Sequence, residues 1–314
     1  MDIPSAKSLI RRNIPFYLAG ALLLLGMKYY YSRGGPDSLS WILAPTARWV
    51  SALSGIPFIK VPQTGYVSHS CRFIIAASCS GLQFLMISMT ALVFSYIHRM
   101  RTIKGKIGWM ALSALASYLL TIFVNGFRIL FSIFIPIYLG MSGTAWTDVS
   151  GSAWAETAGS SGPAPARAWS IWLTPKQLHT IIGTAVYFTA LFAVCQLGEY
   201  VSRKCSAAPG TSHRGNSRAR AGFYPIRALG RWAPPAFWYF SIVLGIPFLN
   251  RAYRNRPQTF TDYALLLTAV CLTVITFYCI CSELHRRICQ LTSGRYRKNM
   301  KMWTDIVLNY IISC

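Results

Sequence analysis

The chain has 314 residues, of which 54% are hydrophobic and only 12% are charged. This composition excludes an ordinary soluble protein, because too few polar residues remain to cover the surface of a domain of that size. Its 31 Lys and Arg residues, against 8 Asp and Glu, lie in short stretches between apolar runs, as basic residues beside membrane spans do. We expect a polytopic membrane protein whose basic residues meet anionic lipid head groups, with no nucleic-acid partner.

The nine cysteines show no clear metal-site spacing, since Cys279 and Cys281 lie too close together to be judged. Most of the nine lie inside apolar runs, where buried packing thiols are common. We expect neither a metal nor an organic cofactor. The sequence does not indicate an oligomeric state.

The N-terminal run has Arg11 and Arg12 before it and no small-residue cleavage site after it, which indicates a retained anchor. The next segment, 39–58, contains Pro45 and Arg48 and is less apolar. We expect it to lie at the outer interface rather than to cross. A pair of short spans within 32–71 is the alternative, and it gives the same orientation downstream.

Six apolar runs reach the length of about 20 residues that a crossing helix needs. The expected fold is therefore an all-α transmembrane bundle of six to eight spans with interfacial segments on its outer face. The run 107–139 would be about 50 Å long as one helix, longer than a bilayer. We expect its part after Asn125 to tilt, bend back or lie along the outer surface. The six runs are approximately 13–31, 73–97, 107–125, 179–199, 233–250 and 261–281.

Basic groups follow the second, fourth and sixth runs, and all fall on the side of the N-terminus if the spans alternate. The positive-inside rule makes that side cytoplasmic. The loop 141–176, with tryptophans at 146, 154, 169 and 172, then lies outside. We expect four regions: an N-terminal anchor and outer segment (1–71), a catalytic membrane core (72–201), a basic cytoplasmic linker (202–232) and a C-terminal transmembrane extension (233–314).

Three short clusters near the ends of apolar runs share the outer face in this topology. They place a thiol (Cys79), a guanidinium (Arg128) and an imidazole (His179) at a similar depth. A free thiol is only a few per cent thiolate at neutral pH, and a nearby imidazole and cation lower its pKa. These residue types are the parts of a cysteine acyl-transfer site, with Arg128 available to an oxyanion.

Neighbouring residues have supporting roles in this interpretation. Gly81 leaves room for a substrate backbone beside the thiol, and Ser78 and Ser80 supply local hydrogen bonds. Asn125 lies one helical turn before Arg128, where it orients the guanidinium or contacts substrate. Cys71 lies about 12 Å from Cys79 if the segment between them is helical, too far for a disulfide, so we expect a free thiol at Cys79.

At these residues the chain resembles the exosortase and archaeosortase family of polytopic membrane cysteine enzymes. The resemblance spans about 70–200. Its ordered motifs are a Cys-Ser-Gly run, an Asn-x-x-Arg element and a His with Gly four residues on, matched by Cys79 to Gly81, Asn125 to Arg128, and His179 to Gly183.

The resemblance implies that Cys79 is the nucleophile, His179 the acid and base, and Arg128 the transition-state stabiliser. It implies a bacterial plasma-membrane enzyme that cuts a C-terminal sorting signal of an exported protein outside the membrane and passes the acyl group to an acceptor. Such a signal has a short motif such as Pro-Glu-Pro, a transmembrane helix and a basic cluster. The family is often found in bacteria that make exopolysaccharide.

Ordinary structural roles remain open for each residue. Cys79 could be a packing thiol, Arg128 could reach lipid head groups, His179 could begin a helix, and Gly183 could serve helix packing. Ser80 or Ser88 is a weaker alternative nucleophile.

Two other classes of function are the alternatives, a multi-span transporter and a non-catalytic scaffold. All eight acidic residues lie in loops or at span ends, whereas carriers commonly place carboxylates inside their spans. No internal repeat with paired broken helices is evident either. A scaffold would tolerate the loss of the Cys79 thiol.

Overall fold

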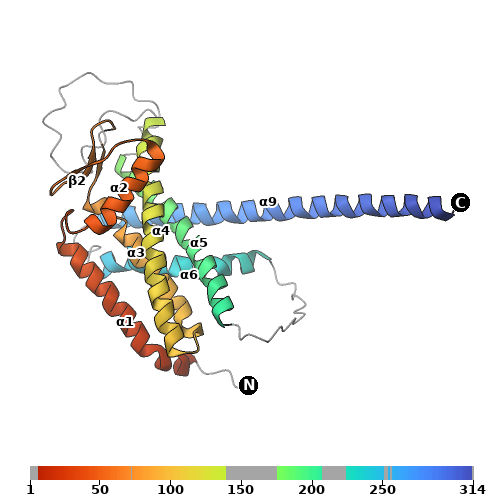
Figure 1. Cartoon of the computed structure of the whole chain (residues 1–314), viewed down its shortest axis with the longest axis horizontal. Coiled ribbons are helices and arrows are strands. Elements are labelled where there is room, and N and C mark those ends of the chain that lie inside the picture. Colours follow the sequence, from red (N-terminus) through yellow and green to blue (C-terminus); the bar gives the residue numbers. More distant parts are fainter. Residues whose placement is uncertain are drawn as a thin grey trace.

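The computed structural model describes residues 6–71, 73–138, 175–206, 224–250, 254 and 257–312. Helices dominate, and one small sheet interrupts them near the N-terminal third of the chain (Figure 1). The elements in order are α1 (Ala6–Arg33), α2 (Ser40–Ser54), β1 (Ile59–Val61), β2 (Gly65–Ser68), β3 (Phe73–Ile75), the 3₁₀ helix η1 (Ala77–Cys79), α3 (Leu82–Tyr96), the 3₁₀ helix η2 (Ile97–Arg99), α4 (Ile103–Tyr138), α5 (Pro175–Ser206), α6 (Tyr224–Val243), α7 (Gly245–Leu249) and α9 (Pro257–Ile312).

Five helical segments of the described residues are long and apolar enough to cross a membrane. They confirm the expected all-α multi-pass class. The first expected run, 13–31, is helical within α1 but is not among these five. The five segments are Ala77–Arg99, Ile103–Tyr138, Gln177–Lys204, Trp232–Leu249 and Gln258–Leu284.

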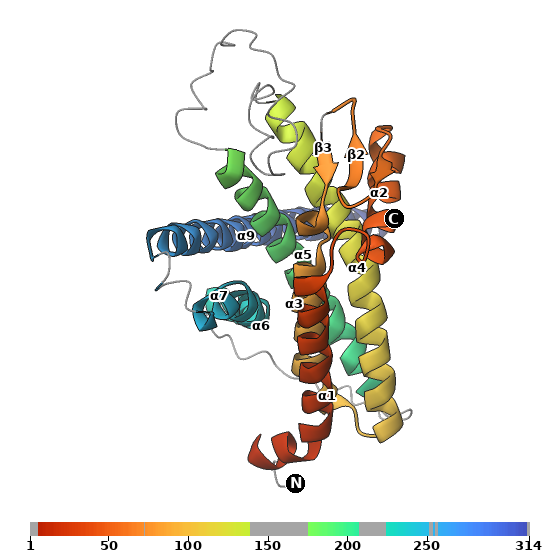
Figure 2. The same cartoon turned by 90° about the vertical axis from the view of Figure 1, so that its left-hand side faces the viewer.

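The helices fall into two sets with different directions. In both Figure 1 and Figure 2, α1, α3, α4 and α5 run alongside one another, whereas α6 and α9 run across them. The four helices of the N-terminal set thus share one direction, which α6 and α9 do not follow. Most of the expected loop 141–176 and of the linker 202–232 lies outside the described residues, and the last two loop residues, Pro175 and Lys176, begin α5.

Helix α4 is continuous over 36 residues, or about 54 Å. It does not bend back after Asn125, and its C-terminal part extends past the start of α3 toward the sheet (Figure 2). Its buried face carries small polar residues every fourth position, which is the spacing of one helical face. Small side chains let neighbouring helices approach closely. The stripe consists of Ser113, Ser117, Thr121 and Asn125.

The segment 39–58, expected to lie at the outer interface, is not among the five candidate spans. Helix α2 has 15 residues, about 22 Å, and packs against α4 through Trp49, whose ring lies 4.8 Å from that of Phe123. A Cβ at Gly126 would lie 2.4 Å from the Trp49 ring, so glycine makes this close approach possible.

The small sheet was not predicted from the sequence. It is antiparallel in the order β1-β2-β3. Its strands have three or four residues, too few to leave a clear alternating pattern. Phe73 and Ile75 of β3 are buried in one cluster with residues of α2 and α4, so the sheet joins the membrane helices at the end that holds Cys79.

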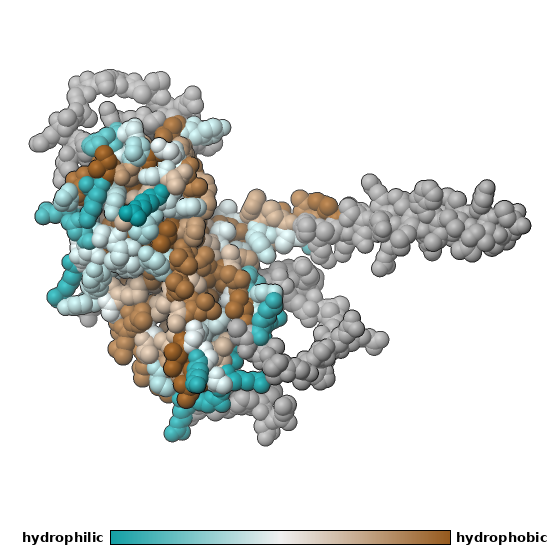
Figure 3. Space-filling model, viewed as in Figure 1, coloured by the Kyte–Doolittle hydropathy of each residue, from teal (hydrophilic) through white to brown (hydrophobic). Residues whose placement is uncertain are grey.

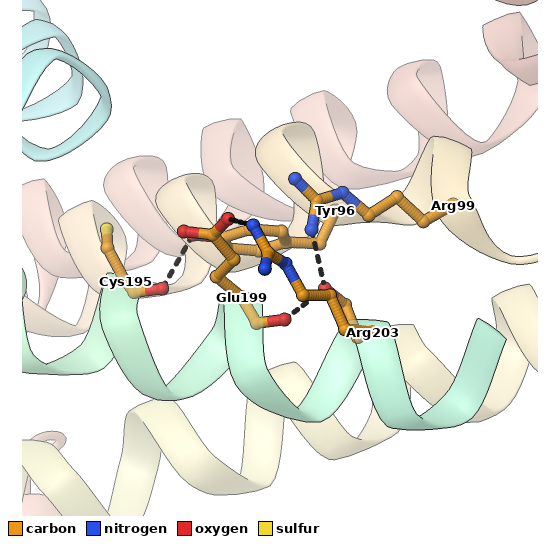
Figure 4. Close-up of polar contacts among 6 residues, drawn as sticks. Tyr96, Arg99, Cys195, Glu199 and Arg203 are labelled. Atoms are coloured by element: carbon orange, nitrogen blue, oxygen red, sulfur yellow. Dashed lines mark hydrogen bonds and ion pairs between the residues drawn. The ribbon is translucent and has the colours of Figure 1, made fainter. Parts of the chain in front are cut away.

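The opposite end of the bundle is held by polar contacts between α3, η2 and α5 (Figure 4). Tyr96 donates to the Cys195 carbonyl at 2.7 Å, and Arg99 donates to the Ser202 hydroxyl at 3.1 Å. Lys106 of α4 lies over an aromatic ring of α1. Basic residues thus gather at this end, away from the sheet: His98 and Arg99 of η2, Lys104 and Lys106 at the start of α4, and Arg203 and Lys204 at the end of α5. Between the ends, hydrophobic residues cover the middle of the visible face (Figure 3).

Candidate active site

Cys79 lies at the junction between the sheet and the membrane helices. Strand β3 ends at Ile75, and a single turn of 3₁₀ helix, η1, carries the chain to Cys79. The backbone N–H of Cys79 donates to the Ala76 carbonyl at 2.9 Å, which closes this turn. The Cys79 side chain is 6% exposed, and both Cys79 and Cys71 are free thiols, as expected.

Gly81 fixes how closely the start of α3 approaches α4. Its φ is +74°, a left-handed conformation that favours glycine. A Cβ at this position would lie 2.8 Å from Cβ and Cγ of Asn125. Both the backbone conformation and the close contact therefore require glycine. Because the start of α3 approaches α4 so closely at Gly81, the Cys79 backbone lies against the Asn125 side chain.

Asn125 is fully buried and hydrogen-bonded at both ends of its amide. Its Nδ2 donates to the Cys79 carbonyl at 2.6 Å, and its Oδ1 accepts from the Tyr187 hydroxyl at 2.8 Å. The second bond fixes the orientation of the amide, because a phenol hydrogen needs the oxygen as its acceptor. Asn125 therefore positions the backbone of Cys79 rather than its sulfur.

Arg128 occupies the centre of the site. Its Nη1 donates to the Tyr187 hydroxyl at 3.1 Å, and its Nη2 contacts Nε2 of His179 at 2.7 Å. Guanidinium nitrogens only donate, so Nε2 of His179 is the acceptor. A neutral His179 then carries its hydrogen on Nδ1, which faces the Ser132 hydroxyl at 3.3 Å.

The charge of Arg128 has no acidic counter-ion within the described part of the chain. Its guanidinium interacts electrostatically with the Cys79 thiol and with the hydroxyls of Tyr187 and Tyr239. Tyr31 of α1 interacts with both Cys79 and Arg128. A buried cation without a carboxylate costs stability, and it is suited to stabilise a thiolate or an oxyanion.

Helix α5 presents three site positions on one face. His179, Gly183 and Tyr187 are spaced by four residues, which places them one above another. A Cβ at Gly183 would lie 3.0 Å from Nε of Arg128, so Gly183 makes room for the guanidinium. Tyr187 was not predicted from the sequence, although its spacing from His179 and Gly183 is the signal that points to it.

The two serines beside Cys79 differ in position. Ser78 is exposed, whereas Ser80 is 1% exposed and its hydroxyl accepts from the Leu82 N–H at 3.4 Å. Ser80 thus helps to begin α3. Ser78 faces the surface beside the thiol.

The C-terminal helices also reach this region. The Tyr239 side chain of α6 lies beside Thr184 of α5, and Tyr263 of α9 interacts electrostatically with Arg128. Trp232 of α6 stacks on Phe192 of α5 with ring centroids 3.8 Å apart. The extension therefore packs against the helix that carries His179.

The structure brings the three motif clusters into one hydrogen-bonded network. Asn125 links the Cys79 backbone to Tyr187, Tyr187 links to Arg128, and Arg128 links to His179. Among the described residues, no hydrogen bond joins His179 to Cys79. Arg128 is the charged group that interacts with the thiol. Within the same residues, no three His, Cys, Asp or Glu side chains form a metal-binding group.

Comparison with known proteins gives one match. The transmembrane exosortase family model matches residues 6–158, about half of the chain, which includes Cys79 and Arg128. His179 and the C-terminal helices lie beyond the matched residues. No curated protein and no solved structure matches the chain. Together with its apolar helices, the match identifies a multi-pass membrane protein that belongs to the transmembrane exosortase family.

Proposed function

We propose that the protein is a cysteine peptidase and transpeptidase that cleaves the C-terminal sorting signal of exported proteins. The observation that carries the proposal is the network that runs from Cys79 through Asn125, Tyr187 and Arg128 to His179. A packing thiol or a lipid-facing arginine would need none of these bonds. The buried charge of Arg128 near a thiol also favours chemistry over a scaffold role.

In the proposed reaction, the Cys79 sulfur attacks the carbonyl carbon of the scissile peptide bond. The carbonyl oxygen becomes an oxyanion, which Arg128 stabilises. The carbon–nitrogen bond then breaks, and a thioester joins the substrate acyl group to Cys79. An acceptor nucleophile attacks this thioester, takes the acyl group and releases the thiol.

His179 carries the proton in this scheme. Its Nε2 accepts from Arg128 in the structure, so the nitrogen is not free to take a proton until that bond opens. We expect Arg128 to release Nε2 of His179 and to donate to the substrate carbonyl oxygen instead when the substrate binds. Nε2 can then move the thiol proton to the leaving nitrogen, which departs as an amine.

We place this site at the extracytoplasmic face of a bacterial plasma membrane. The basic residues at the other end of the bundle support this orientation. The substrate would carry a signal of the Pro-Glu-Pro type followed by a membrane helix and a basic cluster.

The test is processing of a membrane reporter that ends in such a signal, co-expressed with the full-length protein. Cys79→Ala, Arg128→Ala and His179→Ala should each abolish processing while the protein still inserts. Mass measurement of the product identifies its new C-terminus and any attached acceptor. Normal processing by Cys79→Ala would rule out the mechanism and favour a scaffold or a transporter.

A further inference from the structure

The edge of β3 lies directly before the nucleophile and leaves backbone groups available. A Cβ at Gly65 would lie 2.4 Å from the Ile75 carbonyl oxygen, so this carbonyl points toward β2. Residues of an antiparallel strand point their N–H and C=O groups alternately to the two sides. The backbone groups of Ile74 therefore point away from β2, toward the edge of the sheet that pairs with no described strand.

The pairing of the other strands agrees with this direction. Ile75 is opposite Tyr66, and Ile74 is opposite Val67. Val67 in turn is opposite Ile59 of β1, so its own backbone groups are directed to β1. Among the described residues, no backbone hydrogen bond outside the strand pairing involves Ile74, so the alternation leaves its N–H and C=O unpaired within the sheet. An unpaired edge of this kind is a template for an added strand.

We propose that β3 binds the substrate as an added parallel strand and thereby delivers the scissile bond to Cys79. This inference rests on the proposed function and names how that site holds its peptide. The occupant is the extended segment of the sorting signal immediately before the cleavage point.

The direction of the peptide follows from the path of the chain. β3 leads from the outer sheet through η1 to Cys79 and then into the membrane with α3. A substrate whose membrane helix follows its cleavage site runs the same way, so the two strands are parallel. In a parallel pair, Ile74 donates to one peptide carbonyl and accepts from the N–H two residues later.

The spacing sets which peptide residues are held. From Ile74 to Cys79 the chain advances by two residues of extended backbone and three residues of 3₁₀ helix. The distance between the two residues is therefore at most about 13 Å. An extended peptide covers this distance in about four residues. Backbone recognition would therefore act within about four residues before the scissile bond, largely independent of their side chains.

The test uses the purified full-length protein in lipid nanodiscs and a synthetic peptide with a Pro-Glu-Pro segment, an apolar helix and a basic end. Ile74→Pro removes the outward N–H while the bonds of β3 to β2 remain. We expect kcat/KM to fall at least tenfold, the loss typical of about one hydrogen bond. Alkylation of Cys79 by iodoacetamide, measured by peptide mapping, should stay at the wild-type rate.

Lys60→Pro is the matched control. Lys60 is opposite Tyr66 on β1, and by the same alternation its N–H points outward from the far edge of the sheet. This variant should cleave the peptide at the wild-type rate. Equal kcat/KM for Ile74→Pro and Lys60→Pro would overturn strand addition. A smaller oligomer for Ile74→Pro, with unchanged cleavage, would instead assign the edge to a second copy of the chain.

A scan of the peptide supplies an independent measurement if Ile74→Pro disturbs Cys79 alkylation. Single N-methyl groups are placed on successive non-proline residues before the scissile bond and tested with the wild-type enzyme. One sensitive position within about four residues, flanked by tolerant ones, supports the proposal; uniform tolerance overturns it. Absence of cleavage of the unmodified peptide would count against the proposed function itself.

Discussion

Tyr187 donates its phenolic hydrogen to Oδ1 of Asn125 at 2.8 Å, and the same hydroxyl accepts from Arg128 at 3.1 Å. One oxygen thus joins the residue that holds the Cys79 backbone to the residue that interacts with the Cys79 thiol. The Tyr187 ring also packs on Phe84 of α3 with centroids 5.0 Å apart. Tyr187 is therefore a positioning residue that sets the relative placement of α3, α4 and α5 around the site.

Tyr187→Phe should lower the rate of signal processing at least about tenfold, because Asn125 and Arg128 lose their shared partner while the ring packing remains. The matched control is Tyr96→Phe, which removes a buried hydroxyl at the opposite end of the bundle. Processing of the reporter by the two variants is compared at equal expression. Similar losses in both would mean that Tyr187 acts only through general stability.

Asn125→Asp should stop processing almost completely while the side chain keeps its size. The carboxylate cannot donate to the Cys79 carbonyl, and it would pair with Arg128, which has no acidic partner in the described chain. We expect slower alkylation of Cys79 as well, because the new carboxylate would draw the Arg128 guanidinium toward itself and alter the surroundings of the thiol. Wild-type alkylation together with wild-type processing would contradict this role.

Gly183→Ala should reduce processing about tenfold, since the added Cβ would lie 3.0 Å from Nε of Arg128 and displace the guanidinium. Alanine also favours the helix by about 1 kcal/mol, so the thermal midpoint should not fall. Gly108→Ala in α4 is the control, because its Cβ meets nothing within 4 Å. If Gly183→Ala lowers the thermal midpoint but leaves processing intact, then Gly183 serves helix packing rather than the placement of Arg128.

Gly81→Ala should destabilise the protein by more than about 2 kcal/mol, since it combines left-handed backbone with a contact of 2.8 Å to Asn125. Gly55→Ala isolates the backbone part, because its φ is +71° and its Cβ meets nothing within 4 Å. That variant should cost about 1 kcal/mol. Equal shifts in the unfolding midpoint would remove the argument for close contact between Gly81 and Asn125.

Single cysteines at the two ends of the bundle test the orientation. Lys60→Cys on β1 should react with a membrane-impermeant maleimide added to intact spheroplasts, whereas Arg101→Cys should react only after the membrane is opened. Both positions are exposed, and peptide mapping separates them from the native thiols. The reverse pattern would place the site on the cytoplasmic face.

Apolar runs and residue spacing were enough to predict the helical membrane class. About 20 consecutive apolar residues have few alternatives to a helix in lipid, because the backbone must satisfy its own hydrogen bonds there. The order of Cys79, Arg128 and His179 along three such runs likewise predicted that these residues share a site, and the structure brings their motif clusters into one hydrogen-bonded network. Gly81 and Gly183 were recognisable as candidates for the same reason.

The contacts within the site depended on the tertiary structure. The family resemblance implied that His179 is the acid and base for Cys79, and in the structure the packing of α5 on α4 puts Arg128 against Nε2 of His179. The strands of the sheet are too short to produce an alternating hydrophobic pattern in the sequence. The direction in which α6 and α9 cross the other helices is likewise not encoded in the hydrophobic pattern of either helix. Hydrophobic pattern acts within one helix, whereas the approach of two helices is set by side-chain shape across their interface. The sequence alone thus indicated the membrane helices and the candidate reactive residues, and the packing of the helices decided which of those residues meet.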